Sequence, residues 1–200
     1  MGEVKVTEEL RATVRGELPE ISEIQNVRLR DKVVEAWATA LAGSSFSAIG
    51  EIPPSGNPDT RQLSSGTQTD HMRGVTRLAM RIADELKDMF PALPVKRDIL
   101  VAGALCHDVG KPWEFDPVNQ ARWKASPGAT GFPSIRHPPR GVHVCLTVGL
   151  PEEVAHISGC HSGEGELVQR SLEATIVHHA DYTFWHVLAA GGMMDDGKAE

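Results

Sequence analysis

An apolar run in the middle of the chain ends on two ionisable residues, His107 and Asp108. The run before them, Ile99 to Cys106, is apolar throughout and predicts a buried helix. Placing an imidazole and a carboxylate at the end of such a helix costs free energy unless a partner compensates. A divalent cation would compensate, because both groups are metal ligands. The alternative is a helix that stops at Gly110, with the histidine near the negative end of the helix dipole.

The periodicity of the apolar residues predicts an all-α fold. Residues from Met72 to Phe90 follow the 3.6-residue period most clearly, with Thr69 or Asp70 as the expected N-cap. No segment shows sustained alternation of apolar and polar residues, so we expect a single compact helical bundle. The predicted helices are 20–42, 70–90, 95–108, 138–150, a short helix from Pro151, and 167–190.

Two long segments between the predicted helices are rich in Gly, Pro and Ser. They are residues 43–69 and 111–136, and loops of this length in compact domains are often functional. We therefore divide the chain into an N-terminal helical extension with its long loop (1–66), a main helical domain (67–190) and a polar tail (191–200). Residues 1–19 are expected to form a loose arm or a short helix.

The composition narrows the possible function classes. Of the 200 residues, 40% are hydrophobic and 24% charged, which is typical of a folded globular domain. The net charge of −7 argues against a broad nucleic-acid surface, and the apolar runs are too short to cross a bilayer. The N-terminus has no apolar signal segment, and the cysteines, Cys106, Cys145 and Cys160, are widely spaced. We expect a cytoplasmic protein with reduced, buried thiols.

Ligand-type residues stand beside several of the predicted helices. They come from five segments and are His71, His107, Asp108, His137, His161 and Asp181. Side chains that project inward from several helices of a bundle are a recurrent way to build a two-metal site. Two metals about 3.5–4 Å apart can stabilise an in-line phosphoryl displacement.

The order of these residues resembles that of the HD superfamily of metal-dependent phosphohydrolases. Residues 102–111 look like the His-Asp-x-Gly-Lys core of that family, and 137–141 look like its His-Pro-x-x-Gly segment. His161 and Asp181 match its later histidine and terminal aspartate. The resemblance covers roughly residues 68 to 188, so the range 67–190 is expected to be an HD domain. The Gly-Tyr-Pro signature of the cyclic-dinucleotide branch is missing, so that activity is not expected.

The resemblance implies a set of metal ligands and a reaction. It assigns His71, His107, Asp108 and Asp181 to a first metal, and it implies that Asp108 bridges to a second metal held by His137 and His161. The cofactors would be divalent ions, two in number, from among Mn, Fe, Co, Ni, Zn and Mg. The implied reaction is hydrolysis of a small phosphate ester, a nucleotide or related monoester or diester, by a metal-activated hydroxide.

Four basic residues are candidates for contact with the phosphorylated substrate. Asp108 and Lys111 are the expected catalytic residues, and the substrate contacts are expected from Lys111, Arg136, Arg140 and Arg61. For each basic residue the alternative is a solvated surface charge. The aromatic residues Trp113, Phe115 and Trp123 either line a substrate pocket or pack their loop onto the helices.

Two alternative functions and three alternative roles for histidines stay open. The same helical scaffold can hold two irons in an oxygenase, and a metal-binding HD module can also be non-catalytic. His143 competes with His137 as a ligand, but it would lie in the middle of a helix. His156 competes with His161 and is better explained as a core histidine. His178 shares a helix face with Asp181 and either supports the site from behind or lies on the surface.

Overall fold

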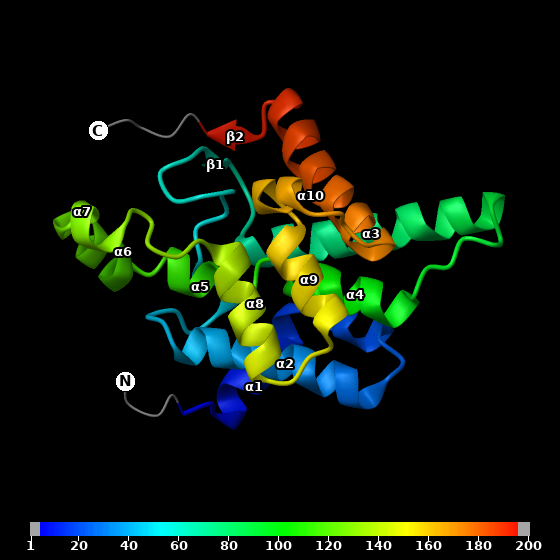
Figure 1. Cartoon of the computed structure of the whole chain (residues 1–200), viewed down its shortest axis with the longest axis horizontal. Helices are drawn as coiled ribbons and strands as arrows, with labels where there is room; N and C mark the ends of the chain where they lie inside the picture. The colour runs from blue at the N-terminus through cyan, green and yellow to red at the C-terminus, as the bar shows by residue number, and fades with distance from the viewer. Residues whose placement is uncertain (1–4, 196–200) are drawn as a thin grey trace.

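Helix α4 (Arg97–Cys106) lies at the centre of the fold, and its apolar side chains are buried on two sides. Val101 and Leu105 belong to a core cluster shared with α1 (Glu8–Glu17), α2 (Val27–Ala42), α8 (His137–Thr147) and α9 (Glu152–Cys160). Leu100 and Ala104 belong to a second cluster shared with α3 (Gln68–Met89), α9 and α10 (Leu172–Ala190). Figure 1 shows α8 and α9 side by side in front of α4, with α1 and α2 below. The end of α4 is therefore fixed from both sides by packing.

The structure is a computed structural model that describes residues 5–195. The longer helices are α1 (Glu8–Glu17), α2 (Val27–Ala42), α3 (Gln68–Met89), α8 (His137–Thr147), α9 (Glu152–Cys160) and α10 (Leu172–Ala190). The shorter elements are α5 (Lys111–Glu114), α6 (Pro117–Ala125), α7 (Pro127–Thr130), the 3-10 turns η1 (Pro19–Glu23), η2 (Ile49–Glu51) and η3 (Gly163–Leu167), and the strands β1 (Gln62–Leu63) and β2 (Met194–Asp195). The all-α prediction is confirmed, since the strands of the described chain are two residues long.

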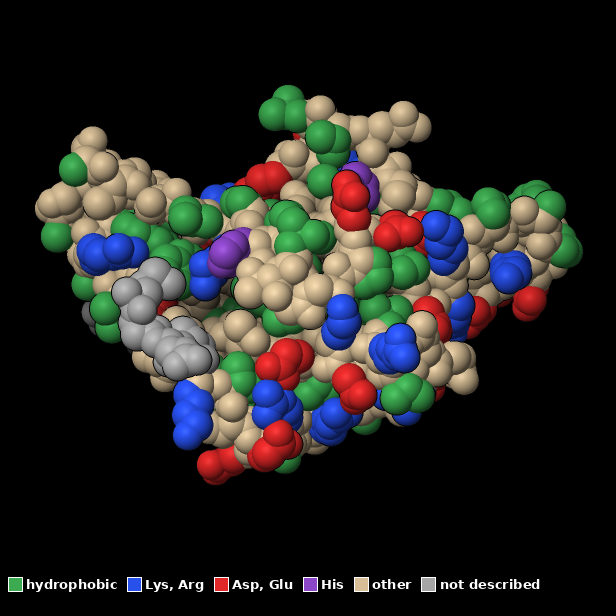
Figure 2. Space-filling model, turned by 60° about the horizontal axis from the view of Figure 1, so that its bottom comes forward, with side chains coloured by type: hydrophobic (Ala, Val, Ile, Leu, Met, Phe, Trp, Pro, Cys, Tyr) green, Lys and Arg blue, Asp and Glu red, His purple; other side chains and the backbone are tan. Residues whose placement is uncertain are grey.

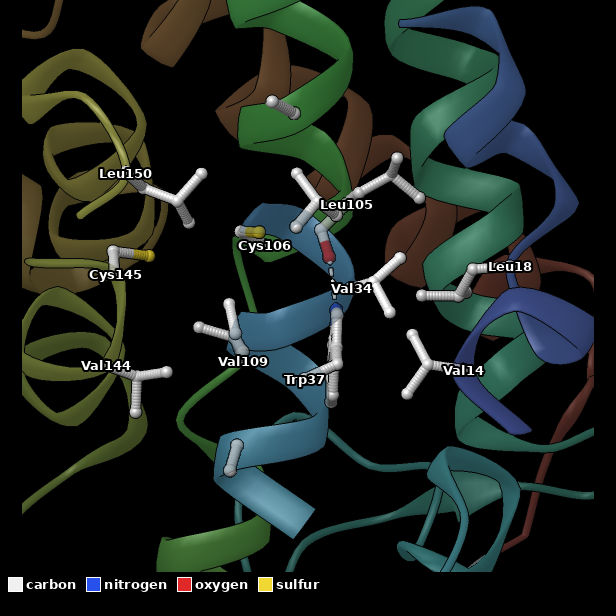
Figure 3. Close-up of a cluster of buried hydrophobic side chains, with 14 of the residues drawn as sticks. Val14, Leu18, Val34, Trp37, Leu105, Cys106, Val109, Val144, Cys145 and Leu150 are labelled. Atoms are coloured by element: carbon white, nitrogen blue, oxygen red, sulfur yellow. Dashed lines mark hydrogen bonds between the residues drawn. The ribbon is translucent and has the colours of Figure 1, made fainter. Parts of the chain in front are cut away.

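A buried tryptophan fixes the end of α4. Trp37 is fully buried on α2, and its Nε1 donates a hydrogen bond of 2.6 Å to the Leu105 carbonyl (Figure 3). The Val109 N–H, which would continue the helix by bonding to Leu105, bonds to the Cys106 carbonyl instead. The helix therefore ends at Cys106 and not at Asp108 as predicted. His107 and Asp108 lie in the turn that follows.

Helix α3 begins earlier than predicted, because its N-cap lies before both expected caps, Thr69 and Asp70. Thr67 is the N-cap, and its side chain accepts from the Asp70 N–H while the Asp70 carboxylate accepts from the Thr67 N–H. This reciprocal pair satisfies two backbone donors that the first turn would otherwise leave free. The shift places Gln68 and His71 in the first turn, three residues apart on one face, and both are buried.

Residues 111–136 are not the unstructured loop that was predicted. They form α5, α6 and α7, which extend to one side of the molecule in Figure 1. Pro112, Pro117 and Pro127 stand in the first turns of these helices, where a missing N–H costs nothing. Reading the prolines as helix breakers was wrong, because each of them starts a helix.

Other helix boundaries also differ from the prediction. The predicted helix 20–42 is divided because the Asp98 carboxylate accepts from the Gln25 and Asn26 N–H groups, both at 2.8 Å. Helix α8 stops at Thr147, before Gly149 turns the chain with a positive φ of 74°. The last helix starts at Leu172, capped by Ser171, and not at residue 167.

The first long loop and the tail meet in a small antiparallel sheet. Gln62 pairs with Asp195 and Leu63 with Met194, so part of the predicted polar tail is a strand. Residues 1–4 of the predicted arm and 196–200 of the predicted tail lie outside the described residues. The domain division at residue 67 stays a prediction, although α1 and α2 share a core cluster with α4, α8 and α9.

The helices and the surface bear on the predicted absence of membrane and nucleic-acid partners. Within residues 5–195, none of the helices has the length and apolar character needed to span a membrane. On the face shown in Figure 2, acidic and basic side chains are interspersed and do not form one continuous basic area. Cys106 and Cys145 are buried free thiols as expected, whereas Cys160 is partly exposed. The cytoplasmic location stays a prediction.

Replacing Trp37 with alanine is expected to destabilise the protein strongly. The variant loses a fully buried indole and the hydrogen bond to Leu105, and similar substitutions cost about 3–5 kcal/mol. Trp37→Phe keeps most of the apolar contact but leaves the Leu105 carbonyl unpaired, which costs about 1–3 kcal/mol. Urea unfolding followed by circular dichroism measures both values. Equal stability of Trp37→Phe and the wild type would show that the hydrogen bond does not hold the end of α4.

Candidate metal centre

Asp108 stands at the centre of a group of buried polar side chains. Its Oδ2 lies 3.1 Å from His71 Nε2 and 3.4 Å from His107 Nε2. Its Oδ1 lies 3.4 Å from His137 Nε2 and 3.5 Å from His161 Nε2. Each carboxylate oxygen therefore faces its own pair of imidazoles. The two sets, His71–His107–Asp108 and Asp108–His137–His161, each bring their ligand atoms within 4.8 Å of one another.

Each of these side chains is positioned by the end of a different helix. His71 lies in the first turn of α3, His107 follows α4, His137 is the first residue of α8, and His161 follows α9. Gly110 permits the close approach of two of these segments, because a Cβ at this position would overlap the His137 carbonyl. The structure thus brings together four histidines that are far apart in the sequence.

Asp181 completes the group from α10. Its Oδ1 lies 3.5 Å from His71 Nε2 and 3.9 Å from His107 Nε2. This oxygen is buried and has no hydrogen-bond partner among the described residues. A buried acceptor without a donor is costly, and a cation between Asp181, His71 and His107 would satisfy it.

The outer nitrogens of three imidazoles are held by acceptors. His107 Nδ1 lies 2.7 Å from the Ala104 carbonyl, and His161 Nδ1 lies 2.8 Å from the Ser158 carbonyl. His137 Nδ1 lies 2.5 Å from Glu114 Oε2. An N–H that donates to such an acceptor fixes the tautomer and leaves the Nε2 lone pair directed inward, as in metal-bound histidines. The donor set therefore fits divalent cations.

His71 is held in a different way. Its Nδ1 is buried and has no hydrogen-bond partner among the described residues. The imidazole is stacked on Trp185 with ring centroids 4.7 Å apart, and Phe184 meets it edge-on at 4.8 Å. Its Nε2 lies only 3.2 Å from His107 Nε2. Two ring nitrogens at this distance need a proton or a cation between them.

The protonation states follow from burial and charge in the metal-free arrangement. Burial lowers the pKa of His71 to about 4, so this imidazole is neutral at pH 7. Burial also lowers the pKa of His107, but the charges of Asp108 and Asp181 outweigh it and raise the pKa overall. Burial raises the pKa of Asp108, but Lys111 and His107 outweigh it and hold the pKa well below its usual range. Asp108 is therefore an ionised carboxylate in the protein interior.

Lys111 and Gln68 complete the surroundings of Asp108. Lys111 Nζ lies 2.8 Å from Asp108 Oδ2 and donates to the Ser55 carbonyl at 2.7 Å. Gln68 Nε2 donates to the same Asp108 oxygen at 2.9 Å. Lys111 is 1% exposed, so the alternative of a solvated surface charge is excluded for this lysine.

A cavity of about 560 Å³ opens beside these residues. Asp108, Lys111, His137, His161 and Asp181 line it. Its remaining lining residues, termed the outer cavity, are Gly56, Asn57, Arg136, Ser162, Gly163, Glu164, Tyr182 and Trp185, of which Trp185 also stacks on His71. The cavity gives a small molecule access to the residues around Asp108.

Two of the four predicted substrate-binding residues do not reach this cavity. Arg140 lies over the Trp113 ring at 4.3 Å from its centroid. Arg61 lies beside the small sheet, and its Nη2 donates to the Met194 carbonyl at 3.4 Å. Arg136 lines the cavity, with its Nε 3.2 Å from Glu114 Oε1 and 3.5 Å from Glu164 Oε1.

The competing residues are also placed by the structure. His143 is exposed on α8, whereas His137 is buried. His156 is not the fully buried core residue that was expected: it is half-buried, and its Nε2 accepts from the Ser171 N–H. His178 Nδ1 lies 2.6 Å from the carbonyl of His161, so it supports that segment from behind.

The aromatic residues of the 111–136 segment mainly pack that segment onto the helices. Trp123 is 1% exposed and Phe115 is 6% exposed, and neither lines the cavity. The aromatic residues that line the cavity, Tyr182 and Trp185, come from α10 instead.

Sequence reasoning missed five residues of this site. They are Gln68, Glu114, Asn57, Tyr182 and Trp185. Three of them carried a local signal. Gln68 precedes His71 by three residues and shares its helix face, and Tyr182 and Trp185 follow Asp181 by one and four residues on α10. Glu114 and Asn57 lie far in sequence from the histidines, and only the packing of the chain brings them together.

Comparisons with known proteins match the part of the chain that carries these residues. A family model described as HD domain matches residues 69–185, which is more than half of the chain. A similar curated protein is the dihydroneopterin 2′,3′-cyclic phosphate phosphodiesterase of Methanocaldococcus jannaschii, 29% identical over 166 residues. That alignment covers 80% of this chain but only 64% of the relative. No solved structure matches the chain.

Removing the Glu114 carboxylate is expected to weaken metal binding near His137. Glu114 accepts from both the backbone N–H and Nδ1 of His137, and loss of such an outer partner typically lowers metal affinity about 10–100-fold. Isothermal titration with Mn²⁺ compares Glu114→Ala and Glu114→Gln with the wild type. Glu152→Gln, an exposed acid on α9, serves as the control. Unchanged affinity in Glu114→Ala, with a normal circular dichroism spectrum, would remove Glu114 from the site.

Proposed function

Because the chain belongs to the HD domain family, as its motifs indicated, we propose that it is a metal-dependent phosphohydrolase that cleaves a phosphate ester of a small molecule. The observation that carries the proposal is the arrangement around Asp108. An ionised, buried carboxylate faces four imidazoles and a lysine at the base of an open cavity.

The proposed ligands fall into two sets that share Asp108. His71, His107, Asp108 and Asp181 would hold one cation, and Asp108, His137 and His161 would hold the other. This division is supported by the two pairs of imidazoles, each facing its own oxygen of Asp108. Two bound divalent cations would lower the pKa of a water molecule and neutralise charge on phosphoryl oxygens.

The residues of the chain supply position and charge for this reaction. Asp108 links the two pairs of imidazoles, because each of its oxygens lies within 3.5 Å of two of them. Lys111 and Gln68 both contact Oδ2 of the Asp108 carboxylate and hold it in place. The Lys111 ammonium also lines the cavity, where it can stabilise charge on an incoming phosphoryl group.

The relative suggests which substrates to assay first. Its name describes a phosphodiesterase that acts on a cyclic phosphate, and the chain spans about two thirds of that protein's length, 64%. We propose that this chain also acts on a small phosphodiester, with cyclic phosphates first among the candidates. A cytoplasmic location fits such a small-molecule enzyme and stays part of the proposal.

The proposed reaction is tested with purified protein loaded separately with Mn²⁺, Co²⁺, Zn²⁺ and Fe²⁺. Each form is assayed with bis-p-nitrophenyl phosphate, 2′,3′-cyclic nucleotides and phosphomonoesters. We expect hydrolysis with at least one metal. We also expect Asp108→Ala to lose both bound metal, measured by elemental analysis, and activity, while the exposed Asp88→Ala keeps both. Full metal content in Asp108→Ala would contradict the ligand assignment. Oxygen uptake by an iron-loaded form that releases no phosphate would contradict the proposed reaction.

Lys111 is expected to affect turnover more than metal content. Lys111→Met keeps much of the buried volume but removes the charge that faces Asp108 and the cavity. We expect the variant to retain bound metal and to lose about 10²–10³-fold in kcat/KM, as when one stabilising donor is removed. Elemental analysis and steady-state kinetics measure the two effects separately. Wild-type kinetics in Lys111→Met would show that Lys111 has no role in the reaction.

A further inference from the structure

The outer part of the cavity differs in chemistry from the part around Asp108. A phosphoryl group fills only a small part of about 560 Å³, so the cavity has room for a sizeable organic group. That remaining space is lined by the aromatic rings of Tyr182 and Trp185 from α10 and by Asn57 from the first long loop. Tyr182 and Asn57 have no place in the proposed reaction, whereas Trp185 also stacks on His71.

The basic side chains that line the cavity are already paired with carboxylates. Within the described residues, its cationic side chains are Lys111 and Arg136. Lys111 lies 2.8 Å from Asp108 Oδ2, and Arg136 Nε lies within 3.5 Å of both Glu114 and Glu164. A second or third phosphate on the substrate would therefore meet no unmatched positive charge in the outer part of the cavity. A substrate with one phosphoryl group and an otherwise uncharged body fits this lining.

Asn57, a residue that lines the cavity, carries a buried acceptor without a donor. Asn57 Oδ1 is buried and accepts no hydrogen bond from the described residues. Its backbone N–H and carbonyl are both bonded to Thr60 within the loop, so the loop itself holds the residue in place. A ligand that brings an N–H donor to this oxygen would remove the cost of leaving it unpaired.

Tyr182 offers an aromatic surface to the same cavity that Asn57 lines. It lines the cavity and remains 36% exposed. Its ring is supported by His178 at 4.4 Å and by His186 at 5.5 Å, measured between ring centroids. Aromatic side chains in this position bind flat rings by stacking.

We propose that the outer cavity is a subsite for an uncharged, flat heteroaromatic ring with N–H donors, which reaches Tyr182 and Asn57 while the substrate's single phosphoryl group lies at Asp108. This inference rests on the proposed function for the position of the phosphoryl group. The ring subsite itself rests on the lining of the cavity and on the unpaired oxygen of Asn57.

The subsite is tested by binding of guanosine, which carries a flat ring with N–H donors and no phosphate. Isothermal titration of the metal-loaded protein is expected to detect guanosine but not glycerol. We expect Tyr182→Ala to weaken guanosine binding about 10-fold through lost stacking, and Asn57→Ala about 5-fold through the lost hydrogen bond. The matched controls are His179→Ala on the same helix and Ser65→Ala in the same loop, both exposed, and neither should change binding.

Turnover gives a second and separable measurement. We expect kcat/KM for guanosine 2′,3′-cyclic phosphate to exceed that for glycerol 1,2-cyclic phosphate by about 10-fold or more, the size of one stacking contact. Tyr182→Ala should reduce this ratio. We also expect guanosine 5′-monophosphate to bind more tightly than guanosine 5′-triphosphate to the metal-free protein, in which neither nucleotide can bind through a metal.

Each outcome decides between the two proposals. No detectable guanosine binding, or binding that both Tyr182→Ala and Asn57→Ala leave unchanged, would overturn the subsite even if phosphate esters are hydrolysed. Preference for the triphosphate would overturn the inference of a single phosphoryl group. Guanosine binding that both variants weaken would support the subsite even if no ester is cleaved, and in that case the proposed hydrolysis alone would fail.

Discussion

The buried carboxylate of Asp108 is the charge on which the rest of the site depends. A carboxylate in the interior is costly unless cations and hydrogen-bond donors surround it. Here Lys111 and Gln68 contact one oxygen of Asp108, and a pair of imidazoles faces each of its two oxygens. The low pKa of Asp108 follows from its charged neighbours, Lys111 first. The outward hydrogen bonds of three imidazoles leave their Nε2 lone pairs directed inward, beside the unpaired oxygen of Asp181, and such a donor set suits divalent cations.

The architecture explains how such a site is held in place. Helix α4 packs into two separate core clusters, so the turn that carries His107 and Asp108 cannot shift without disturbing both. Trp37 ties the last turn of α4 to α2 through the Leu105 carbonyl, and Gly110 lets the following turn approach the start of α8. Each histidine lies at a helix end, where the backbone is fixed by the helix but the side chain can point into the centre. Rigid positioning of this kind limits the movement of ligands during a reaction.

The main features of the fold and much of the site could be predicted from the sequence, for reasons that are local. The apolar run before His107 and the 3.6-residue apolar period of α3 are both visible within a short stretch of sequence. Both helices were therefore predicted, with ends shifted by one or two residues. The motif residues His71, His137, His161 and Asp181 do lie around Asp108. The short helices after Lys111 were missed because proline both breaks a helix and starts one. Glu114 could not be identified, because its contact with His137 joins residues 23 apart in the sequence, and Asn57 shares the cavity only with residues of other segments. The phosphate contact expected for Arg140 stays a prediction, since its guanidinium lies over the Trp113 ring.

The most direct test of this account is a crystal structure of the Mn²⁺-loaded protein with anomalous diffraction data. Two anomalous peaks are expected, on opposite sides of the Asp108 carboxylate. One should lie among His71, His107 and Asp181, and the other between His137 and His161. An Asp108 carboxylate with no anomalous peak beside it, in crystals soaked at saturating Mn²⁺, would contradict the central claim that these helix ends converge to bind metal.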